Sequence, residues 1–544
     1  MGSFPELMGQ WMQQGLRSSL GPFGPELTIV ATIVLILLNR ILDGDRYCSS
    51  RLLALLGSGL ALWLSCQLPP QVADANTMGV QSSYPAKELF TGLLKLDAWT
   101  VFFRVYLLLF LVLTIALTWL SRLVDDEDGP DFYAMLLGST LGMLLMASSN
   151  HALMLFLAIE MTSIPSYALA GFLKGRRSAS EAALKFAVYG AAAAGVLLYG
   201  LSLLCGVLGT AEFSQMGLHL TLLFEDQRLN WQDPTSRVLL LSLVLIFAGF
   251  AFKLSVVPFH FWCPDVFEGA AAELAGYLSV ASKAAAFALM MRFFAAIFRV
   301  DLPIVHDLSL LAGIGLGAVA IVTATLGNLA AYPQTNLKRM FAYSTIAQAG
   351  YLMMAVAAWV ILTGSSQSDE HVATASERAL EGLLYYLVAY LFMNMGVFAV
   401  IAFIRNRLFS ENLPDWQGVG RQVPFMTGCL AVCLFSLVGL PPFGGFVGKL
   451  FVFFSAVDAT RIHWFFWIVL AAGAVNTVLS LFYYLNVLRV MIFMPARLAT
   501  AETRPESWLE KSYLGLVTIP VVGLGVAVQS FVPFLQWVSR VWSS

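Results

Sequence analysis

The sequence predicts an all-α integral membrane protein, and three observations support that fold class. Of its 544 residues, 59% are hydrophobic and only 12% are charged, whereas soluble domains average about 45–50% apolar and about 25% charged residues. So few charges cannot cover a globular surface of this size, which indicates that lipid covers it. The third observation is a succession of apolar runs of roughly 20 residues, the length at which a helix crosses a bilayer.

Taken in chain order, the apolar runs predict about fourteen transmembrane helices. We expect them near residues 25–42, 51–68, 99–120, 132–150, 152–173, 182–208, 237–261, 275–298, 304–330, 338–362, 383–404, 424–457, 463–493 and 511–537. Residues 364–378 are polar and are predicted to form a mobile loop. No stretch is suited to a soluble domain, and residues 1–23 lack the pattern of a cleaved signal peptide.

Basic residues between the predicted helices indicate the orientation in the membrane. Most of them follow odd-numbered helices, and they include Arg40, Arg51, Arg176, Arg177, Lys338, Arg339, Arg405 and Arg407. The positive-inside rule places these loops in the cytoplasm. An even number of crossings then puts both termini on the outer side.

Two of the predicted helices, the seventh and the twelfth, are interrupted. Pro258 breaks the seventh, and Pro441–Pro442 with nearby glycines breaks the twelfth. Proline lacks an N–H group and crowds the carbonyl four residues earlier, so the Leu254 carbonyl should lose its helical partner. Both breaks show a serine followed by Pro-Phe, beginning at Ser255 and at Ser436.

The two breaks lie an odd number of helices apart, so the segments around them would be inverted in the membrane. Paired discontinuous helices in inverted repeats are typical of ion-coupled transporters. The sequence therefore predicts two inverted five-helix repeats. The expected divisions are an N-terminal three-helix segment at 1–130, the repeats at 131–298 and 299–495, and a last helix at 496–544.

Four ionisable side chains lie deep in apolar runs, namely Glu160, Lys253, Lys283 and Lys449. Lipid offers no partner for such groups, so they normally face a protein interior or a wet cavity and mark an ion path. A structural alternative is that Glu160 only neutralises a lysine, but three lysines against one glutamate leave an imbalance. Burial lowers the pKa of a lysine and a nearby carboxylate raises it again. Movement of Glu160 relative to Lys253 would therefore load or release one proton.

Weaker candidates near the first break allow two interpretations each. His260 is either a proton relay or a satisfied polar residue lining the break. Asp265 and Glu268 are either an entry funnel or interfacial caps. Glu181 and Lys185 are spaced for an ion pair on a helix surface, and a role in a water path is the alternative.

A second group of polar residues gives the predicted tenth helix a stripe. Its members are Tyr343, Ser344 and Gln348. Hydrogen bonding between helices explains such stripes as well as a proton path does.

Other function classes lack support in the sequence. A formal net charge of −2 without a basic cluster argues against nucleic-acid binding. The six cysteines include no Cys-x-x-Cys pair, and Cys429 with Cys433 is interpreted as apolar packing rather than as a metal site. We find no haem-ligand pair, phosphate-binding loop or nucleophile triad.

Several runs together resemble the antiporter-like membrane subunits of respiratory complex I. The runs are LFLAIEM, SYALAGF, EAALKF, KLSVVPFHFWCPDVFEG, LSVASKAAAFAL, NLKRMFAYSTIAQAGYL and PPFGGFVGKLFVF. The resemblance covers roughly residues 130–495, and among the paralogues the wording is most similar to the subunit N branch. It implies that Glu160 pairs with Lys253, that Lys283 passes the proton inward and that Lys449 leads it out.

The same resemblance implies that this chain binds no cofactor itself. NADH, FMN, iron–sulfur clusters and quinone would belong to partner subunits, and the partners would be other membrane-arm and redox subunits. The location would be an energy-coupling membrane, and the length favours a bacterial inner membrane. Two rival functions share these residues: a subunit of a multisubunit cation/proton antiporter or membrane-bound hydrogenase, and a structural anchor that does not conduct protons.

Two departures from the family pattern are visible. After Glu268 and Gly269 the family commonly continues Ala-Pro-Thr-Pro, whereas this chain reads Ala270–Glu273 without proline. The histidine often found in the tenth helix is Gln348 here, which cannot titrate. We expect water or Tyr343 to bridge at that position instead.

Overall fold

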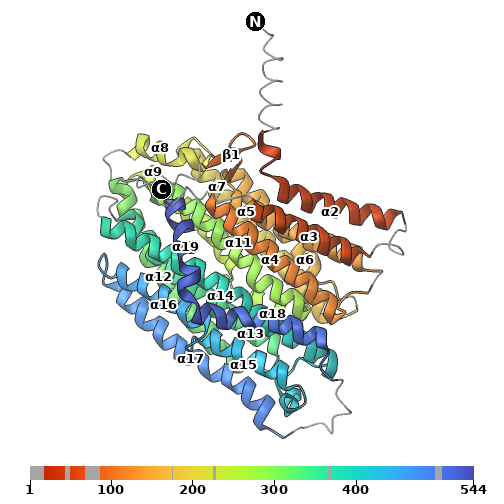
Figure 1. Ribbon diagram of the computed structural model, residues 1–544. Helices are drawn as coiled ribbons and strands as arrows, with labels where there is room; N and C mark the ends of the chain where they lie inside the picture. Colours follow the sequence, from red (N-terminus) through yellow and green to blue (C-terminus); the bar gives the residue numbers. More distant parts are fainter. Residues whose placement is uncertain are drawn as a thin grey trace, which may run out of the picture.

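The computed structural model describes residues 18–42, 49–67, 86–125, 127–173, 175–224, 228–365, 370–495 and 505–543. Long helices run roughly side by side in one bundle, with α2 and α3 on one flank and α17 on the opposite flank (Figure 1). The helices of the N-terminal half are α2 (Gly24–Ile41), α3 (Ser50–Gln67), α4 (Ala98–Ser121), α5 (Gly129–Ser148), α6 (Ala152–Ala170), α7 (Arg177–Leu208), α8 (Phe213–Phe224), α9 (Pro234–Leu254) and α10 (Trp262–Gly269). A short hairpin, β1 (Lys87–Leu89) with β2 (Leu94–Leu96), precedes α4.

The C-terminal half continues with long helices and two further breaks. Its elements are α11 (Ala272–Phe298), α12 (Pro303–Ala331), α13 (Leu337–Gly364), α14 (Glu370–Leu408), the 3-10 turns η2 (Leu413–Trp416) and η3 (Val419–Arg421), α15 (Pro424–Val438), α16 (Gly444–Ala459), α17 (Phe465–Phe493), α18 (Trp508–Val526) and α19 (Val528–Ser543). The fold class predicted from composition is confirmed, because nearly every described element is a helix.

The helices long enough to cross a membrane can be compared with the predicted crossings. Within the described ranges, twelve helices are long and apolar enough to cross a membrane. The number is thirteen if the bent pair formed by Leu413–Arg421 and α15 counts as a single span. Helix α3 and the broken pair α15–α16 occupy two of the predicted crossings but are not among the twelve. The count of about fourteen and the two inverted repeats therefore stay predictions.

Burial separates central helices from peripheral ones. In the most apolar part of α13 all residues are buried, and in α11 and α14 the buried share is 89%. In α2, α7, α17 and α18 it is 28%, so one face of each lies open at the edge of the bundle. The candidate lysines lie where the central helices meet the two broken ones.

One predicted loop is shorter than expected. Residues 364–378 were expected to be irregular because they are polar, yet residues 370–378 form the first turns of α14, which continues without interruption to Leu408. Residues 366–369 lie outside the described ranges. Ion pairs with other helices hold the first turns of α14, since Arg378 pairs with Asp458 at 3.1 Å and Glu377 with Arg540 at 3.7 Å.

The basic residues assigned to the cytoplasm meet at one end of the bundle. Arg51 and Arg122 line one hollow there, and Arg122, Arg176 and Arg405 line an adjoining hollow of about 400 Å³. The predicted grouping of the odd loops is thus seen in the structure, while the side of the membrane stays a prediction. Most of the first 23 residues lie outside the described ranges.

The opposite end is closed by contacts between distant parts of the chain. The Lys87 ammonium of β1 donates to the Ser18 carbonyl at 2.9 Å. The indole rings of Trp99 in α4 and Trp542 in α19 stack with centroids 4.4 Å apart. Arg299, directly after α11, donates to the Trp542 carbonyl at 2.7 Å. Both ends of the described chain therefore lie at this end of the bundle.

Candidate functional site at the two helix breaks

At the first break, α9 ends at Leu254 and the chain turns through Ser255, whose φ is 58°. Side chains donate to carbonyl groups at the break, including the Leu254 carbonyl that Pro258 leaves without a helical partner. Leu254 O accepts a hydrogen bond of 2.8 Å from the Lys283 ammonium of α11, and Phe252 O accepts one of 2.9 Å from the Trp262 indole. The predicted loss of a helical partner at Leu254 is confirmed, and the partner that replaces it is one of the candidate lysines.

Lys253 lies beside that carbonyl and is 4% exposed. Its ammonium donates to the Ser163 hydroxyl of α6 at 2.9 Å. Glu160 is one turn earlier on α6 and half-buried, and its charge acts on Lys253 through space. Among the described residues Glu160 and Lys253 form no direct ion pair, and the Lys253 ammonium is bonded to Ser163 instead.

A tyrosine that the sequence analysis did not select extends this group. Tyr167 follows Ser163 by one turn on α6 and lies close to both Ser163 and Glu160. Its hydroxyl occupies the space beside Gly190 of α7, where a Cβ would come within 1.9 Å of the oxygen. The spacing of residues 160, 163 and 167 along one helix face was the available signal.

At the second break, α15 ends at Val438 and the chain turns through Gly439, with φ at 92°. Lys449 of α16 is 3% exposed, and its ammonium donates to Leu437 O and Val438 O at 3.0 Å each. The ammonium also lies 4.3 Å from the centre of the Tyr351 ring, a cation–π contact.

The two breaks align residue by residue when their left-handed positions are superposed. Ser255 then corresponds to Gly439, and each is followed three residues later by Pro-Phe. The serine that precedes Pro-Phe at the second break, Ser436, therefore lies three residues before the position that matches Ser255. Ser436 has a different role, because its hydroxyl accepts a bond of 2.9 Å from the Gly445 amide.

Gln348 of α13 is in direct contact with the second break. Its Nε2 donates to Leu437 O at 3.3 Å, the carbonyl that Lys449 also uses. The Tyr386 hydroxyl of α14 donates to Gln348 Oε1, and Tyr484 of α17 contacts both Gln348 and Ser344. The predicted stripe thus reaches this site through Ser344 and Gln348.

The exception in that stripe is Tyr343, which is partly exposed and packs against the apolar core. The hydroxyl groups that contact Gln348 are those of Tyr386 and Tyr484 rather than that of Tyr343, and a bridging water stays a prediction.

A row of polar side chains on α14 bonds to residues near each break and was missed from the sequence. Asn394 Nδ2 donates to the Ser279 hydroxyl of α11 at 2.5 Å and to the Tyr390 hydroxyl at 2.9 Å. Ser279 lies one turn before Lys283, while Tyr386, one turn before Tyr390, reaches Gln348. The signal was the spacing of 386, 390 and 394 in an otherwise apolar run.

The acidic candidates after the first break form a network at the bundle surface. Glu181 pairs with Lys185 at 2.8 Å, which confirms the predicted helix-surface pair. Lys185 also pairs with Asp265 at 2.7 Å, and Arg339 pairs with Asp265 at 2.8 Å and with Glu268 at 2.6 Å. The network connects α7, α10 and α13.

His260 is separate from all of these groups. It is 5% exposed, and its Nδ1 has no hydrogen-bond partner among the described residues.

The turn that lacks the family's prolines is held by charges from α13 and α14. The Lys338 ammonium donates to Ala270 O at 2.5 Å and pairs with Glu411 at 2.7 Å. Glu273 pairs with Arg405 at 3.2 Å. Among the residues that the structure describes, no group of three or more His, Cys, Asp or Glu side chains is arranged to hold a metal ion.

Comparisons with known proteins cover nearly the whole chain. The family model described as NADH:quinone oxidoreductase/Mrp antiporter, transmembrane, matches residues 149–480. A curated NADH-quinone oxidoreductase subunit N of Anaeromyxobacter is 36% identical over 97% of this chain and 97% of its own length. A chain of respiratory complex I from Thermus thermophilus is 26% identical with a TM-score of 0.71, covering 94% of this chain and 98% of that one. A chain of the Mrp complex from Dietzia shares the fold at 18% identity, with a TM-score of 0.76 and coverage of 96% and 97%.

Proposed function

The chain belongs to the NADH:quinone oxidoreductase/Mrp antiporter transmembrane family, and from this premise we propose that it is a proton-translocating membrane-arm subunit of an NADH:quinone oxidoreductase. The main support is that three buried lysines lie on or beside two broken helices. The chain is also 36% identical to a curated subunit N over 97% of its length. A buried ammonium bound only to neutral carbonyls can lose its proton without leaving an unpaired carboxylate behind.

The proposed route begins at Glu160, half-buried at the edge of α6, and continues to Lys253 through the Ser163 hydroxyl. Lys283 is next, because its ammonium is bound to the carbonyl of the residue that follows Lys253. Lys449 would then release the proton. Each hydrogen bond from a charged group contributes about 1.5–3 kcal/mol. The carbonyls that accept from Lys283 and Lys449 therefore stabilise the protonated form of each lysine, so each lysine can hold the proton between transfers.

The remaining assignments follow from the family. The redox chemistry would take place in partner subunits that hold NADH, FMN, iron–sulfur clusters and quinone, and this chain would contact other membrane-arm subunits. We place it in a bacterial inner membrane with both termini outside, in accordance with the basic residues gathered at one end of the bundle. The division into a three-helix segment, two inverted repeats and a last helix belongs to the same proposal.

The test is Lys283→Ala in the native complex, with NADH-driven quinone reduction and pH-gradient formation recorded together. Lys511→Ala is the matched control, since that ammonium is 43% exposed and pairs with Glu506 outside the route. We expect the Lys283 variant to assemble, as judged on native gels, and to lose oxidation and pumping together. Full pumping by the Lys283→Ala variant would indicate that the chain is a structural anchor. Sodium-dependent proton exchange without NADH oxidation in the wild type would indicate an antiporter.

A further inference from the structure

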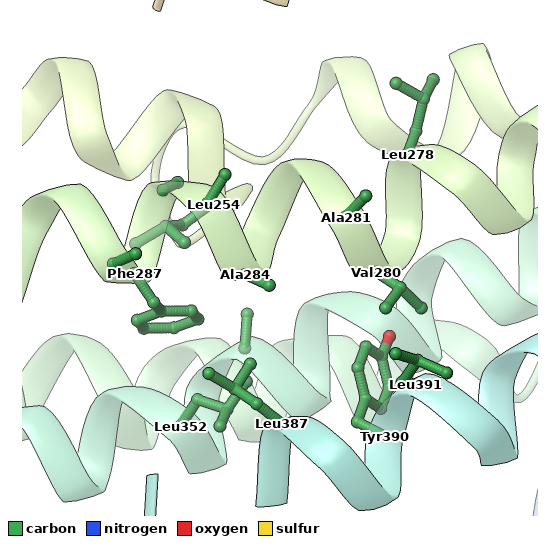
Figure 2. Close-up of a cluster of buried hydrophobic side chains, with 14 of the residues drawn as sticks. Leu254, Leu278, Val280, Ala281, Ala284, Phe287, Leu352, Leu387, Tyr390 and Leu391 are labelled. Atoms are coloured by element: carbon green, nitrogen blue, oxygen red, sulfur yellow. The ribbon is translucent and has the colours of Figure 1, made fainter. Parts of the chain in front are cut away.

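Apolar side chains pack between α11 and its neighbours α13 and α14. Figure 2 shows α11 facing α13 and α14 across Val280, Ala284, Leu352, Leu387 and Leu391, all of them buried. Among the labelled side chains only Tyr390 carries a polar atom, and its hydroxyl points toward α11 (Figure 2). A proton crossing this region needs hydrogen-bonding groups, because hydrocarbon offers it none.

The polar row on α14 supplies such groups at both ends. Tyr390 is 2% exposed and bonded to Asn394, which also holds Ser279 one turn from Lys283. Tyr386 is fully buried and bonded to Gln348, which shares the Leu437 carbonyl with Lys449. One helix therefore carries two hydroxyl groups on one face, each tied to a different break.

The close packing of Tyr386 against the second break depends on the glycine at position 448. A Cβ on Gly448, the residue before Lys449, would lie 2.5 Å from Tyr386 Cδ2 and 3.1 Å from its Cα. Glycine thus allows the Tyr386 ring to pack directly on the turn of α16 that carries the lysine.

The amides at the two ends cannot exchange protons as hydroxyls do. Asn394 donates a hydrogen to both of its partners, so it fixes the Tyr390 oxygen as an acceptor and leaves that hydroxyl's own proton to be donated elsewhere. Gln348 Oε1 accepts the Tyr386 proton and so sets the orientation of that hydroxyl. The two amides are positioning groups, and the two hydroxyls are the groups able to relay.

We propose that Tyr390 and Tyr386 of α14 carry protons between Lys283 and Lys449, with Asn394 and Gln348 orienting them. The Lys283 ammonium gives a proton to the Tyr390 oxygen as the Tyr390 hydroxyl proton moves, directly or through water, to Tyr386. The Tyr386 proton leaves Gln348 and passes to the Lys449 amine. Each tyrosine gains one proton and loses one, Lys283 ends neutral, and Lys449 ends charged. This inference rests on the proposed function and specifies one step of it.

The experiment uses Tyr390→Phe and Tyr386→Phe in the native complex, which remove one oxygen and keep each ring. Tyr385→Phe is the matched control, because that hydroxyl is on the same helix but donates to Leu524 O of α18. We expect each relay variant to lower pumping roughly tenfold or more, as loss of a positioned proton carrier does, while the control pumps normally. Native gels and thermal stability of the assembled complex report any structural loss.

The solvent isotope effect separates a relay from a packing role. If proton transfer limits the rate in Tyr390→Phe and Tyr386→Phe, D2O should slow pumping by these variants by a larger factor than pumping by wild type. A packing defect would not enlarge the isotope effect. Normal pumping in both relay variants, or equal losses in Tyr385→Phe and Tyr390→Phe, would overturn the inference. If Lys283→Ala is inactive while both relay variants pump normally, only this step fails; if Lys283→Ala pumps fully, the proposed function fails first.

Discussion

The two helix breaks face the same physical problem and solve it with different helices. Each frees carbonyl groups at membrane depth, and each presents a lysine ammonium to them. At the first break the lysine comes from α11, a separate helix, while Lys253 of the broken helix turns to α6. At the second break Lys449 belongs to the second half of the broken helix itself. The lysine at the first break therefore joins the broken helix to another one, whereas at the second break the lysine is internal and α13 supplies the outside donor, Gln348.

The largest effect that distinguishes the breaks is expected from removal of their lysines. Lys283→Met would leave Leu254 O buried without a donor, at a cost of about 1–3 kcal/mol. Lys449→Met would leave Val438 O in that state, but Leu437 O would keep Gln348. We expect both variants to lose pumping, with a lower melting temperature of the solubilised complex.

Adding Gln348→Leu sharpens this prediction. It should lower the melting temperature more in the Lys449→Met background than in wild type, because only there does it deprive Leu437 O of its last donor. In the Lys283→Met background, Gln348→Leu should lower the melting temperature by the same amount as it does in wild type. Additive losses in both backgrounds would show that the shared carbonyl is not the connection.

The second prediction concerns packing around the second break. Gly448→Ala places a methyl group 3.1 Å from the Tyr386 Cα, which cannot move as a side chain can. Such overpacking costs about 1–3 kcal/mol, so we expect a lower melting temperature and reduced pumping. Gly428→Ala in α15 is the control, since nothing lies within 4 Å of its added Cβ. Wild-type behaviour of Gly448→Ala would show that α14 and α16 are not closely packed there.

The third prediction exchanges the turn residues of the two breaks. Ser255 adopts a left-handed conformation that costs a non-glycine residue about 1–2 kcal/mol, so Ser255→Gly should raise the melting temperature slightly. Gly439→Ser should lower it, because its φ is 92° and its Cβ would lie 3.0 Å from Lys449 Cδ. The same direction of change in both variants would contradict the correspondence of the two positions.

The smallest effect is expected at the surface network beside the first break. Lys185 is 36% exposed and pairs with Glu181 and Asp265. Exposed pairs contribute about 0.2–1 kcal/mol and weaken with salt. Lys185→Gln should therefore change the melting temperature little at high salt and slightly more at low salt. A large salt-independent loss of pumping would instead assign Lys185 to the proton route.

The sequence predicted what depends on local chemistry. Apolar runs indicated the helices, and proline chemistry identified Leu254 as a carbonyl without a partner. Which donor replaces that partner depends on where α11 packs, so Lys283 was selected for its burial and not for this contact. The α14 row was overlooked because tyrosines in an apolar run are usually packing residues. Polarity was mistaken for irregularity at 370–378, which form the start of α14 and are held by ion pairs.

The stacked rings of Trp99 and Trp542 bear on the order in which the molecule is made. Trp99 is translated before any helix of the two predicted repeats, and Trp542 after all of them. Until α19 is synthesised, the indole of Trp99 has no stacking partner and Arg299 lacks the Trp542 carbonyl. The pair of Asp97 with Arg292 and the bond from the Trp99 indole to Ala288 O need only α4 and α11, so the last helix of the chain adds a second set of contacts to a junction that earlier residues already make.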